Sequence, residues 1–445
     1  MSPPAPSSQE LQYDHLQEQL ERIVKKGIDR AVEAGTTRNE ADCDRLCEEA
    51  QAANKVVACM GPPGCGKTTR AKRLIKHAHD AGGQVLVMFP TGQMQSRMRQ
   101  ELQDAGLRVN VDTCHGACMF HKPESEALPL LTGYSLIVVD EFPQLSRAQF
   151  DRIIRMWEAA GKLPALLFLG DFYQLPGIEG TSAKDSMYWQ HVKKIQLHVC
   201  WRAKGDDTLL RKIRALRKAV PKRRVRNRIL RGHKAWSQDG GPTAWDLVEL
   251  YRKTKRKTTI VTCTRKAAQK VNVLAAEVLH GRARTLTTLP GDFDGNPENY
   301  DDGGKLRTDR RPRPQPVVIK KGLRLHLTRN LDKEGDFVNG MECTVQAWDE
   351  ASQCLRVRTR TGKDVAVYHY TDPDKDHGGA CFFPIRLGYA STIYKMQGAE
   401  LEHVTIYLDV PGQRAAAYVA LSRVRGDGDY LFGGKLTRRH FVPNA

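Results

Sequence analysis

The chain has 445 residues, of which 40% are hydrophobic and 27% are charged, and its formal net charge is +19. This length exceeds one ordinary core, so we expect two or three globular domains rather than a disordered chain. No apolar run approaches the roughly 20 residues of a membrane helix, and the excess of Lys and Arg favours a polyanionic partner, either a nucleic acid or an acidic membrane surface.

The cysteines and the N-terminus bear on the cellular compartment. Residues 1–10, MSPPAPSSQE, lack the charged start and apolar core of a secretory signal, so we expect none. The 11 cysteines then predict free thiols in a reducing intracellular compartment. Cys114, His115, Cys118 and His121 include zinc-binding residue types, but no second C-x-x-C pair completes a usual ligand set. We therefore expect no metal site there.

The first half of the chain alternates between two patterns. We expect residues 1–10 to be disordered and Leu11 to Ala34 to form a charged amphipathic helix. After Lys55, short apolar runs alternate with helical patterns, which is typical of a parallel sheet covered by helices. The runs are KVVACM (55–60), QVLVMFP (84–90), RVNV (108–111), SLIVVDE (135–141), ALLFLGD (165–171) and KIQLHV (194–199).

The segment GPPGCGKT, Gly61 to Thr68, lies between the first run and a helical pattern. Its glycines let backbone N–H groups turn toward phosphate oxygens, and a helix start adds the positive end of its dipole. Lys67 suits the β- and γ-phosphates, and the Thr68 hydroxyl suits Mg²⁺. The segment predicts a nucleoside triphosphate site. Its expected residues are Gly61, Pro62, Gly64, Cys65, Gly66, Lys67, Thr68 and Thr69.

Carboxylates follow a later apolar run. Asp140 and Glu141 end the run that begins at Leu136, so we expect them at the sheet edge where ligands of open α/β folds bind. Asp140 is suited to hold Mg²⁺, and Glu141 is suited to orient and deprotonate an attacking water. This pair predicts a hydrolytic site.

Three further residues are candidates for the same chemistry. Gln174, in GDFYQLP (170–176), can hydrogen-bond the γ-phosphate or the attacking water. Arg202 and Arg423 are candidates to reach the γ-phosphate across a domain cleft, where such an arginine can be worth about 10³–10⁵ in rate. The alternatives are that Gln174 only caps the end of a strand and that Arg202 and Arg423 are solvated.

A second series of helical and strand patterns begins near Ala244. It comprises a helical stretch to Lys257, TTIVTC (258–263), a helix from Lys266 to His280, IRLGYAS (385–391), HVTIYLD (403–409) and a helix from Arg414 to Leu421. Residues 288–316 are rich in Pro, Gly, Asp and Arg and predict a linker poor in regular structure. Residues 317–379 predict a small β insertion, because strands alternate there with glycine turns.

Positive charge is concentrated in residues 211–234, which hold 12 Lys and Arg, and again in residues 252–257. Such clusters bind phosphate backbones without regard to sequence. A solvated helix face stays open as an alternative, as does a nuclear import signal in PKRRVRNR (221–228). Tyr173, Trp201 and Phe337 are candidates either to stack on bases or to lie in the core.

Eight motifs occur in the order found in superfamily one helicases, and they most resemble those of the RecD and Pif-type DNA helicases. They are GPPGCGKT (61–68), FPTGQMQSRM (89–98), TCHGA (113–117), VVDEF (138–142), GDFYQLP (170–176), CWR (200–202), GYASTIYKMQGAEL (388–401) and YVALSRVR (418–425). FVNGMECTVQAW (337–348) is similar to the β-barrel insertion of those enzymes.

The resemblance implies an α/β fold with two RecA-like P-loop domains built on parallel sheets and a small β-barrel insertion in the second. The implied domains are a partly disordered and then helical extension (1–50), a first RecA-like domain (51–203), a second (204–316 and 380–445) and the insertion (317–379). It also implies ATP and Mg²⁺ as cofactors, single-stranded or forked DNA as partner, and 5′→3′ translocation. We expect a monomer without an obligate protein partner and without a membrane.

Position by position, the resemblance assigns roles to individual residues. The ATPase set is Lys67, Thr68, Asp140, Glu141, Gln174, Arg202 and Arg423. Gln397 and Gly398 match the motif that couples the nucleotide to DNA. The residues expected along the single strand are Thr91, His115, Tyr173, Thr392 and Lys395.

Several alternatives stay open. Where the family carries a Gln that recognises adenine, this sequence reads NEAD (39–42), which leaves base selectivity open. A viral-replicase type of RNA helicase has strings like GPPGCGKT and VDEF. A nucleic-acid-stimulated NTPase that remodels without unwinding, and a kinase-like P-loop enzyme, are further alternatives.

Overall fold

The computed structural model describes residues 8–36, 56–90, 92–175, 181–198, 200–201, 205–255, 257–299, 307, 311–332, 334–372, 379–396, 400–410 and 413–444. The chain forms two compact units, residues 1–210 with 444–445 and residues 211–443. Among the described residues, no helix is both long and apolar enough to span a membrane.

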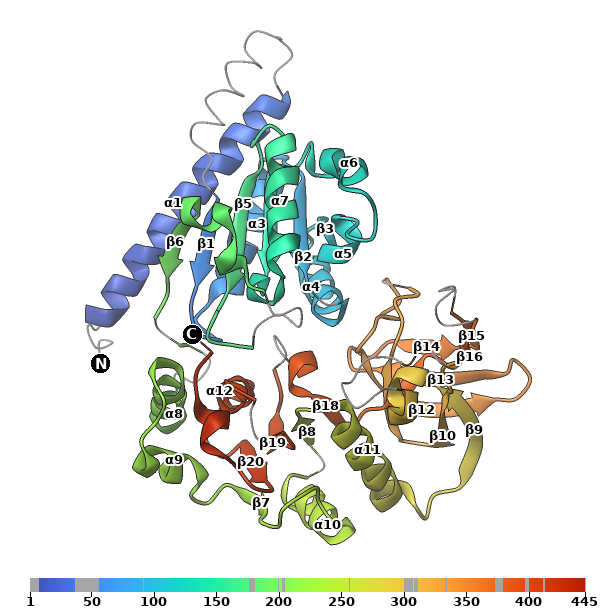
Figure 1. The fold of residues 1–445 in the computed structure, drawn as a ribbon. Coiled ribbons are helices and arrows are strands. Elements are labelled where there is room, and N and C mark those ends of the chain that lie inside the picture. Colours follow the sequence, from blue (N-terminus) through green and yellow to red (C-terminus); the bar gives the residue numbers. More distant parts are fainter. Residues whose placement is uncertain are drawn as a thin grey trace, which may run out of the picture. The chain divides into compact units, whose positions relative to one another are not determined.

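The first unit is built on a six-stranded parallel sheet with the strand order β3-β2-β4-β5-β1-β6 (Figure 1). Its strands are β1 (Val57–Met60), β2 (Val85–Phe89), β3 (Asn110–Thr113), β4 (Leu136–Asp140), β5 (Ala165–Gly170) and β6 (Lys193–Gln196). The six predicted runs all form strands, although the third begins at Asn110 rather than at Arg108. Strands β2, β4 and β5 are buried throughout, as expected of a parallel sheet covered on both faces.

Helices cover both faces of this sheet. They are α1 (Ser8–Thr36), α3 (Lys67–Asp80), α4 (Gly92–Asp104), α5 (Cys114–Ala117), α6 (Glu124–Ala127) and α7 (Arg147–Ala159). One face packs Val57, Val138 and Leu167 against α1, α3 and α4. The other face packs Ile137 and Phe168 against α7. Alternate strand residues therefore serve two separate cores.

The second unit contains a five-stranded parallel sheet with the order β18-β8-β19-β20-β7 (Figure 1). Its strands are β7 (Lys234–Trp236), β8 (Thr258–Thr262), β18 (Ala390–Thr392), β19 (His403–Tyr407) and β20 (Tyr430–Gly433). The helices around it are α8 (Asp207–Lys218), α9 (Arg223–Leu230), α10 (Ala244–Lys253), α11 (Arg265–His280) and α12 (Ala416–Leu421).

The second unit also carries an antiparallel sheet with the order β14-β13-β12-β11-β17. Its strands are β11 (Arg324–Leu327), β12 (Glu342–Asp349), β13 (Cys354–Thr359), β14 (Asp364–Val367) and β17 (Ile385–Leu387). It shares a core with the parallel sheet, in which Leu325 and Val345 lie in one cluster with Ile260. The closed barrel remains a prediction.

Two expectations for this half of the chain are wrong. The single strand expected at residues 385–391 is two strands, β17 and β18, which belong to different sheets. The chain changes sheets at Gly388, where a Cβ atom would come within 3.0 Å of the Leu325 backbone.

The expectation that residues 288–316 form a linker poor in regular structure is also wrong for those residues of the segment that the structure describes. β9 (Thr285–Gly291) pairs with β10 (Gln315–Lys320). Between them, Asn299 Nδ2 donates to the carbonyls of Phe293 at 2.9 Å and Arg313 at 2.8 Å. The Asn299 side chain therefore holds this loop together, an arrangement that the composition of residues 288–316 alone did not predict.

Candidate functional site

The loop between β1 and α3 has the backbone shape that phosphate binding requires. Gly64 and Gly66 have φ of +75° and +85°, which favours glycine. Gly66 precedes α3 and offers no capping side chain, and the first intrahelical bond joins Arg70 N to Gly66 O at 3.0 Å. The amides of the first helical turn have no acceptor within the helix, so this start can receive an anion. At Gly61, a Cβ atom would come within 2.7 Å of Cys65 Sγ.

Lys67 supplies a buried positive charge beside this loop. Its Nζ lies 2.7 Å from Gly61 O and 3.2 Å from Pro62 O. Burial alone would lower the pKa of Lys67, but Cys65, Glu141 and the other nearby acidic groups raise it above its ordinary value. The ammonium therefore stays charged, and an anionic phosphate oxygen is a stronger acceptor for it than a neutral carbonyl.

Asp140, at the end of β4, faces the same loop. Its carboxylate accepts hydrogen bonds from Thr68 Oγ1 at 3.0 Å and from Glu141 N at 2.8 Å. Burial raises the pKa of Asp140 above its ordinary value, although Lys67 and these hydrogen bonds lower it in part. A bound cation would favour the ionised carboxylate. Because Mg²⁺ prefers oxygen ligands, Thr68 and Asp140 fit a magnesium site.

Glu141 and Gln174 complete the cluster. Glu141 has φ +54°, a strained value for a residue other than glycine that costs roughly 1–3 kcal/mol. Gln174 is buried, and its Nε2 lies 3.4 Å from Glu141 Oε2. The structure thus brings together five predicted residues, Lys67, Thr68, Asp140, Glu141 and Gln174.

Two supporting residues received no role from the sequence. Asp171 is buried, and its carboxylate is among the groups that raise the pKa of Lys67. Gly170 ends β5 where a Cβ atom would come within 2.2 Å of Pro143 Cδ, so its lack of a side chain lets the turn after Glu141 pack closely. Their position at the end of a buried strand, with Gly170 as its last residue and Asp171 directly after it, was the available signal.

Other predicted residues lie elsewhere or outside the described part of the chain. Thr91, Arg202, Gln397 and Gly398 lie outside the described residues. Arg423 is buried in the second unit at the end of α12, where its guanidinium donates to Val419 O at 3.0 Å and to Ser422 Oγ at 2.8 Å. Its role toward a nucleotide stays a prediction.

The aromatic candidates differ in exposure. Tyr173 is half-buried, and so is Trp201, which packs against the core of the first unit. Phe337 is only 6% exposed in the core of the second unit, so of its two alternatives the structure supports a place in the core.

The motif around His115 also has a buried part. His115 is exposed and meets Phe120 edge to face, with 5.0 Å between ring centroids. Cys114 and Cys118 are buried, and burial raises the pKa of the Cys118 thiol to about 12. Packed thiols explain both cysteines.

A basic pocket in the second unit contains two of the predicted DNA residues. Thr392 and Lys395 line it with Arg265, Ala268, Gln269, Asn272, Gly295, Arg386, Ala390 and Ser391. Asn272 fixes its wall, because its side chain bonds the backbone N and O of Ala390 at 2.7 and 3.0 Å. Near it, burial and the charges of Arg386, Lys395 and Arg324 lower the pKa of His326 far below its ordinary value. The positive potential suits a phosphate.

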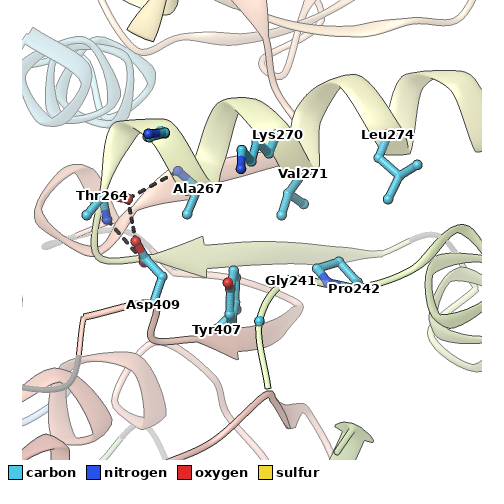
Figure 2. A pocket seen from close by; sticks show the side chains of 11 residues that line it. Gly241, Pro242, Thr264, Ala267, Lys270, Val271, Leu274, Tyr407 and Asp409 are labelled. Atoms are coloured by element: carbon cyan, nitrogen blue, oxygen red, sulfur yellow. Dashed lines mark hydrogen bonds between the residues drawn. The ribbon is translucent and has the colours of Figure 1, made fainter. Parts of the chain in front are cut away.

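A larger pocket of about 450 Å³ lies beside the start of α11 (Figure 2). Asp409 accepts from Cys263 N at 2.7 Å and from Thr264 N at 3.2 Å, and it also bonds the Thr264 hydroxyl. Thr264 Oγ1 in turn accepts from Ala267 N at 3.1 Å. These polar groups hold the helix start in place, so we assign this pocket no catalytic role.

Comparisons with known proteins agree with this geometry. A family model described as an AAA domain matches residues 41–234. The chain is similar to the ATP-dependent DNA helicase PIF1 of Xenopus laevis, with 33% identity over 153 residues, which are 32% of this chain and 24% of that protein. It is similar to Pif1 of Bdellovibrio bacteriovorus, with 33% identity over 128 residues, 27% of this chain and 28% of that protein. The matches therefore span only about a quarter of these relatives.

Solved structures share the fold over most of the chain. The Pif1 helicase of Candida albicans has a TM-score of 0.62 at 18% identity, and the match covers 90% of this chain and 95% of that one. Bacteroides Pif1 bound to single-stranded DNA has a TM-score of 0.63 at 18% identity, with 90% and 92% covered. At this identity the likeness shows the fold, an α/β P-loop helicase fold.

Proposed function

We propose that this chain is a helicase of the Pif1/RecD-like superfamily, a proposal that its similarities support, and that it is an ATP-dependent DNA helicase that moves 5′→3′ along single-stranded DNA. The observation that carries the proposal is the cluster at the end of the first sheet. There, an open helix start, a buried Lys67 and the Thr68–Asp140 pair lie beside Glu141.

Each residue of the cluster has a defined task in this proposal. The amides at the start of α3 and the ammonium of Lys67 bind the phosphates of ATP. Thr68 and Asp140 hold Mg²⁺, which neutralises charge on the phosphates. Glu141 orients a water and accepts its proton, and Gln174, 3.4 Å away, positions the carboxylate.

The assignment of domains belongs to the same proposal. The first unit is the P-loop ATPase domain, the parallel sheet of the second unit is the second RecA-like domain, and the antiparallel sheet is the insertion. Arg202 and Arg423 reach the γ-phosphate in the closed state, and Gln397 and Gly398 couple the nucleotide to DNA. One chain carries all of these residues, which supports a monomer as the working unit.

The basic pocket provides the grip on DNA. Thr392 and Lys395, with Arg265 and Arg386, bind the phosphate backbone of the single strand. Thr91, His115 and Tyr173 contact the same strand from the first unit. Similar proteins have been solved with single-stranded DNA and at forked double-stranded DNA, which supports both as partners.

A strand-displacement assay tests the proposal. Duplexes with a 5′ tail or a 3′ tail, made of DNA or of RNA, are incubated with ATP and Mg²⁺. We expect displacement of DNA from the 5′-tailed duplex only. Displacement restricted to RNA would favour the RNA helicase alternative. Hydrolysis that DNA stimulates without strand displacement would identify a remodelling NTPase instead.

A further inference from the structure

A second strongly charged surface lies on α8 and α9, outside the candidate sites. Residues 208–238 contain 12 Lys and Arg and no Asp or Glu. We define the basic surface as six exposed residues of this segment. They are Arg214, Lys222, Arg223, Arg224, Arg228 and Arg231. No carboxylate pairs with any of them in the ion pairs found among the described residues.

The helix propensity of α9 does not explain this surface. Lys222 is its N-cap, and Arg223 and Arg224 occupy its first turn, where no acidic residue is present. Positive charges are unfavourable at a helix N-terminus. Arg224 and Arg228 are also like charges four residues apart, a spacing that destabilises a helix. Bound polyanion removes both penalties.

A buried network fastens the two helices to the parallel sheet. Lys212 of α8 is buried, and its Nζ lies 2.7 Å from Asp427 Oδ1 and 2.8 Å from Tyr430 Oη. Tyr430 Oη donates to Ile229 O of α9 at 2.9 Å. His233 stacks on the Tyr430 ring at 4.0 Å. The basic surface therefore projects from a fixed support.

The basic surface and the basic pocket lie at opposite edges of this sheet. Its strand order places β18, which lines the pocket, at one edge and β7 at the other. Figure 1 shows α8 and α9 beside β20 and β7, and α11 beside β18 and β8. Five strands separate the two edges by about 19 Å. A nucleotide bound in the pocket therefore does not reach the basic surface.

The chemistry of the basic surface favours a duplex over a single strand. Residues 208–234 contain no Phe, Tyr or Trp. Sites for single strands combine basic residues with aromatic side chains on which bases stack. Duplex DNA instead hides its bases and carries one charge per about 1.7 Å of axis.

We infer that the basic surface of α8 and α9 binds the phosphate backbone of the double-stranded arm of a fork, while the basic pocket holds the translocating strand. This inference rests on the proposed DNA helicase function. Holding the duplex arm keeps the enzyme at the junction between rounds of hydrolysis.

A charge-neutralising variant tests the inference. Arg223→Gln, Arg224→Gln and Arg228→Gln are combined, and binding to a blunt DNA duplex and to oligo(dT) is measured over a salt series without nucleotide. We expect the slope of log affinity against log salt for the duplex to fall by about 2.7, with about tenfold or more loss of affinity. Binding of oligo(dT) and its stimulation of ATP hydrolysis should stay unchanged.

A matched control separates local contacts from net charge. Lys253→Gln, Lys266→Gln and Lys270→Gln remove the same charge from exposed positions on α10 and α11. We expect duplex affinity close to that of the parent. The melting temperature of the α9 variant should not fall, because Arg223 and Arg224 are cations in the first turn of α9 and the change also removes the repulsion between Arg224 and Arg228, which outweighs the loss of Arg228 from the last turn. Restoring charge with Lys at the three positions should restore duplex binding.

Several outcomes would overturn the inference. Unchanged duplex affinity in the α9 variant would assign the surface to solvent or to a protein partner, such as a nuclear import receptor. An equal loss in the control would make the effect one of net charge. An equal loss of oligo(dT) binding would show that the basic surface binds the single strand rather than the duplex arm. The parent's hydrolysis response to oligo(dT) tests the proposed function separately.

Discussion

The two parallel sheets contain the same strand–loop–helix unit with opposite chemistry at the helix start. In the first unit, Gly66 precedes α3 and leaves the first-turn amides without a side-chain cap. In the second unit, the Thr264 hydroxyl caps α11, and Asp409 binds the backbone of the same turn (Figure 2). One helix start is open to an anion and the other is closed by the protein. The fold alone does not distinguish the two helix starts, but the residues at the strand ends do, and our proposal places the nucleotide at the open one.

The two units also differ in how completely their charged side chains are compensated by opposite charges. Arg329 of the second unit is paired with both Asp292 and Asp372, and its guanidinium lies 4.8 Å from the centre of the Phe382 ring. Asp140 of the first unit is buried with a raised pKa, so its ionised form is stabilised less than it would be in water. Perturbed charges of this kind are typical of functional sites.

The largest expected effect comes from removing the charge at the open helix start. Lys67→Ala should lower the rate of ATP hydrolysis by about 10³-fold or more, because residues 61–68 contain no other Lys or Arg. DNA binding should remain and should stay sensitive to salt. Steady-state hydrolysis and DNA titrations measure the two effects.

Lys76→Ala is the control for that variant, since Lys76 lies on the same helix but is exposed and pairs with Asp80. It should hydrolyse ATP at the parental rate. Hydrolysis retained by Lys67→Ala would mean that the open helix start is not the nucleotide site.

A smaller effect is expected at the basic pocket. Arg265→Gln with Lys395→Gln should raise the concentration of oligo(dT) that half-stimulates hydrolysis by about tenfold, since each lost phosphate contact lowers the salt slope by about 0.7. The rate without DNA should not change. Lys266→Gln with Lys270→Gln alters the neighbouring pocket on α11 instead and should leave the titration unchanged. An equal rise in this oligo(dT) concentration in both variants would contradict specific binding of DNA in the basic pocket.

Asp140→Asn should have opposite effects on ATP hydrolysis, which it should abolish, and on thermal stability, which it should increase. Burial raises the pKa of Asp140, so the ionised carboxylate costs stability, and this cost disappears as the pH falls through that pKa. The variant should lose Mg²⁺-dependent hydrolysis, yet it should melt at a higher temperature than the nucleotide-free parent at about pH 8. The difference should shrink in acid. A lower melting temperature at every pH would show that the carboxylate stabilises the fold.

The smallest effect is expected at His403 in the second unit. Burial, with the charges of Lys253 and His233, lowers the pKa of His403 from 6.5 to about 4. The unfolded chain binds this proton more tightly, so stability should be lost as the pH falls from about 6.5 to about 4. His403→Gln can keep the hydrogen bond to Thr258 and should flatten that loss in thermal melts. His121→Gln, which replaces an exposed histidine, should leave the loss of stability in acid unchanged.

Sequence patterns predicted the strands of the first sheet and the proximity of Lys67, Thr68 and Asp140 well, for physical reasons. Buried parallel strands leave continuous apolar runs, and a phosphate loop needs glycine and lysine at fixed spacing. Local patterns could not reveal the tie of Asn299 to Arg313, the sheet change at Gly388 or the burial of Phe337, because each depends on residues distant in sequence. The proximity of Asp171 to Lys67 has the same origin.

The rate of ATP hydrolysis by the unaltered protein, measured with and without oligo(dT), tests the central claim most directly. If the open helix start is the motor site and the basic pocket holds DNA, oligo(dT) should raise the rate many-fold, and the rise should vanish at high salt. A rate that oligo(dT) leaves unchanged at every salt concentration would contradict the coupling of the two sites.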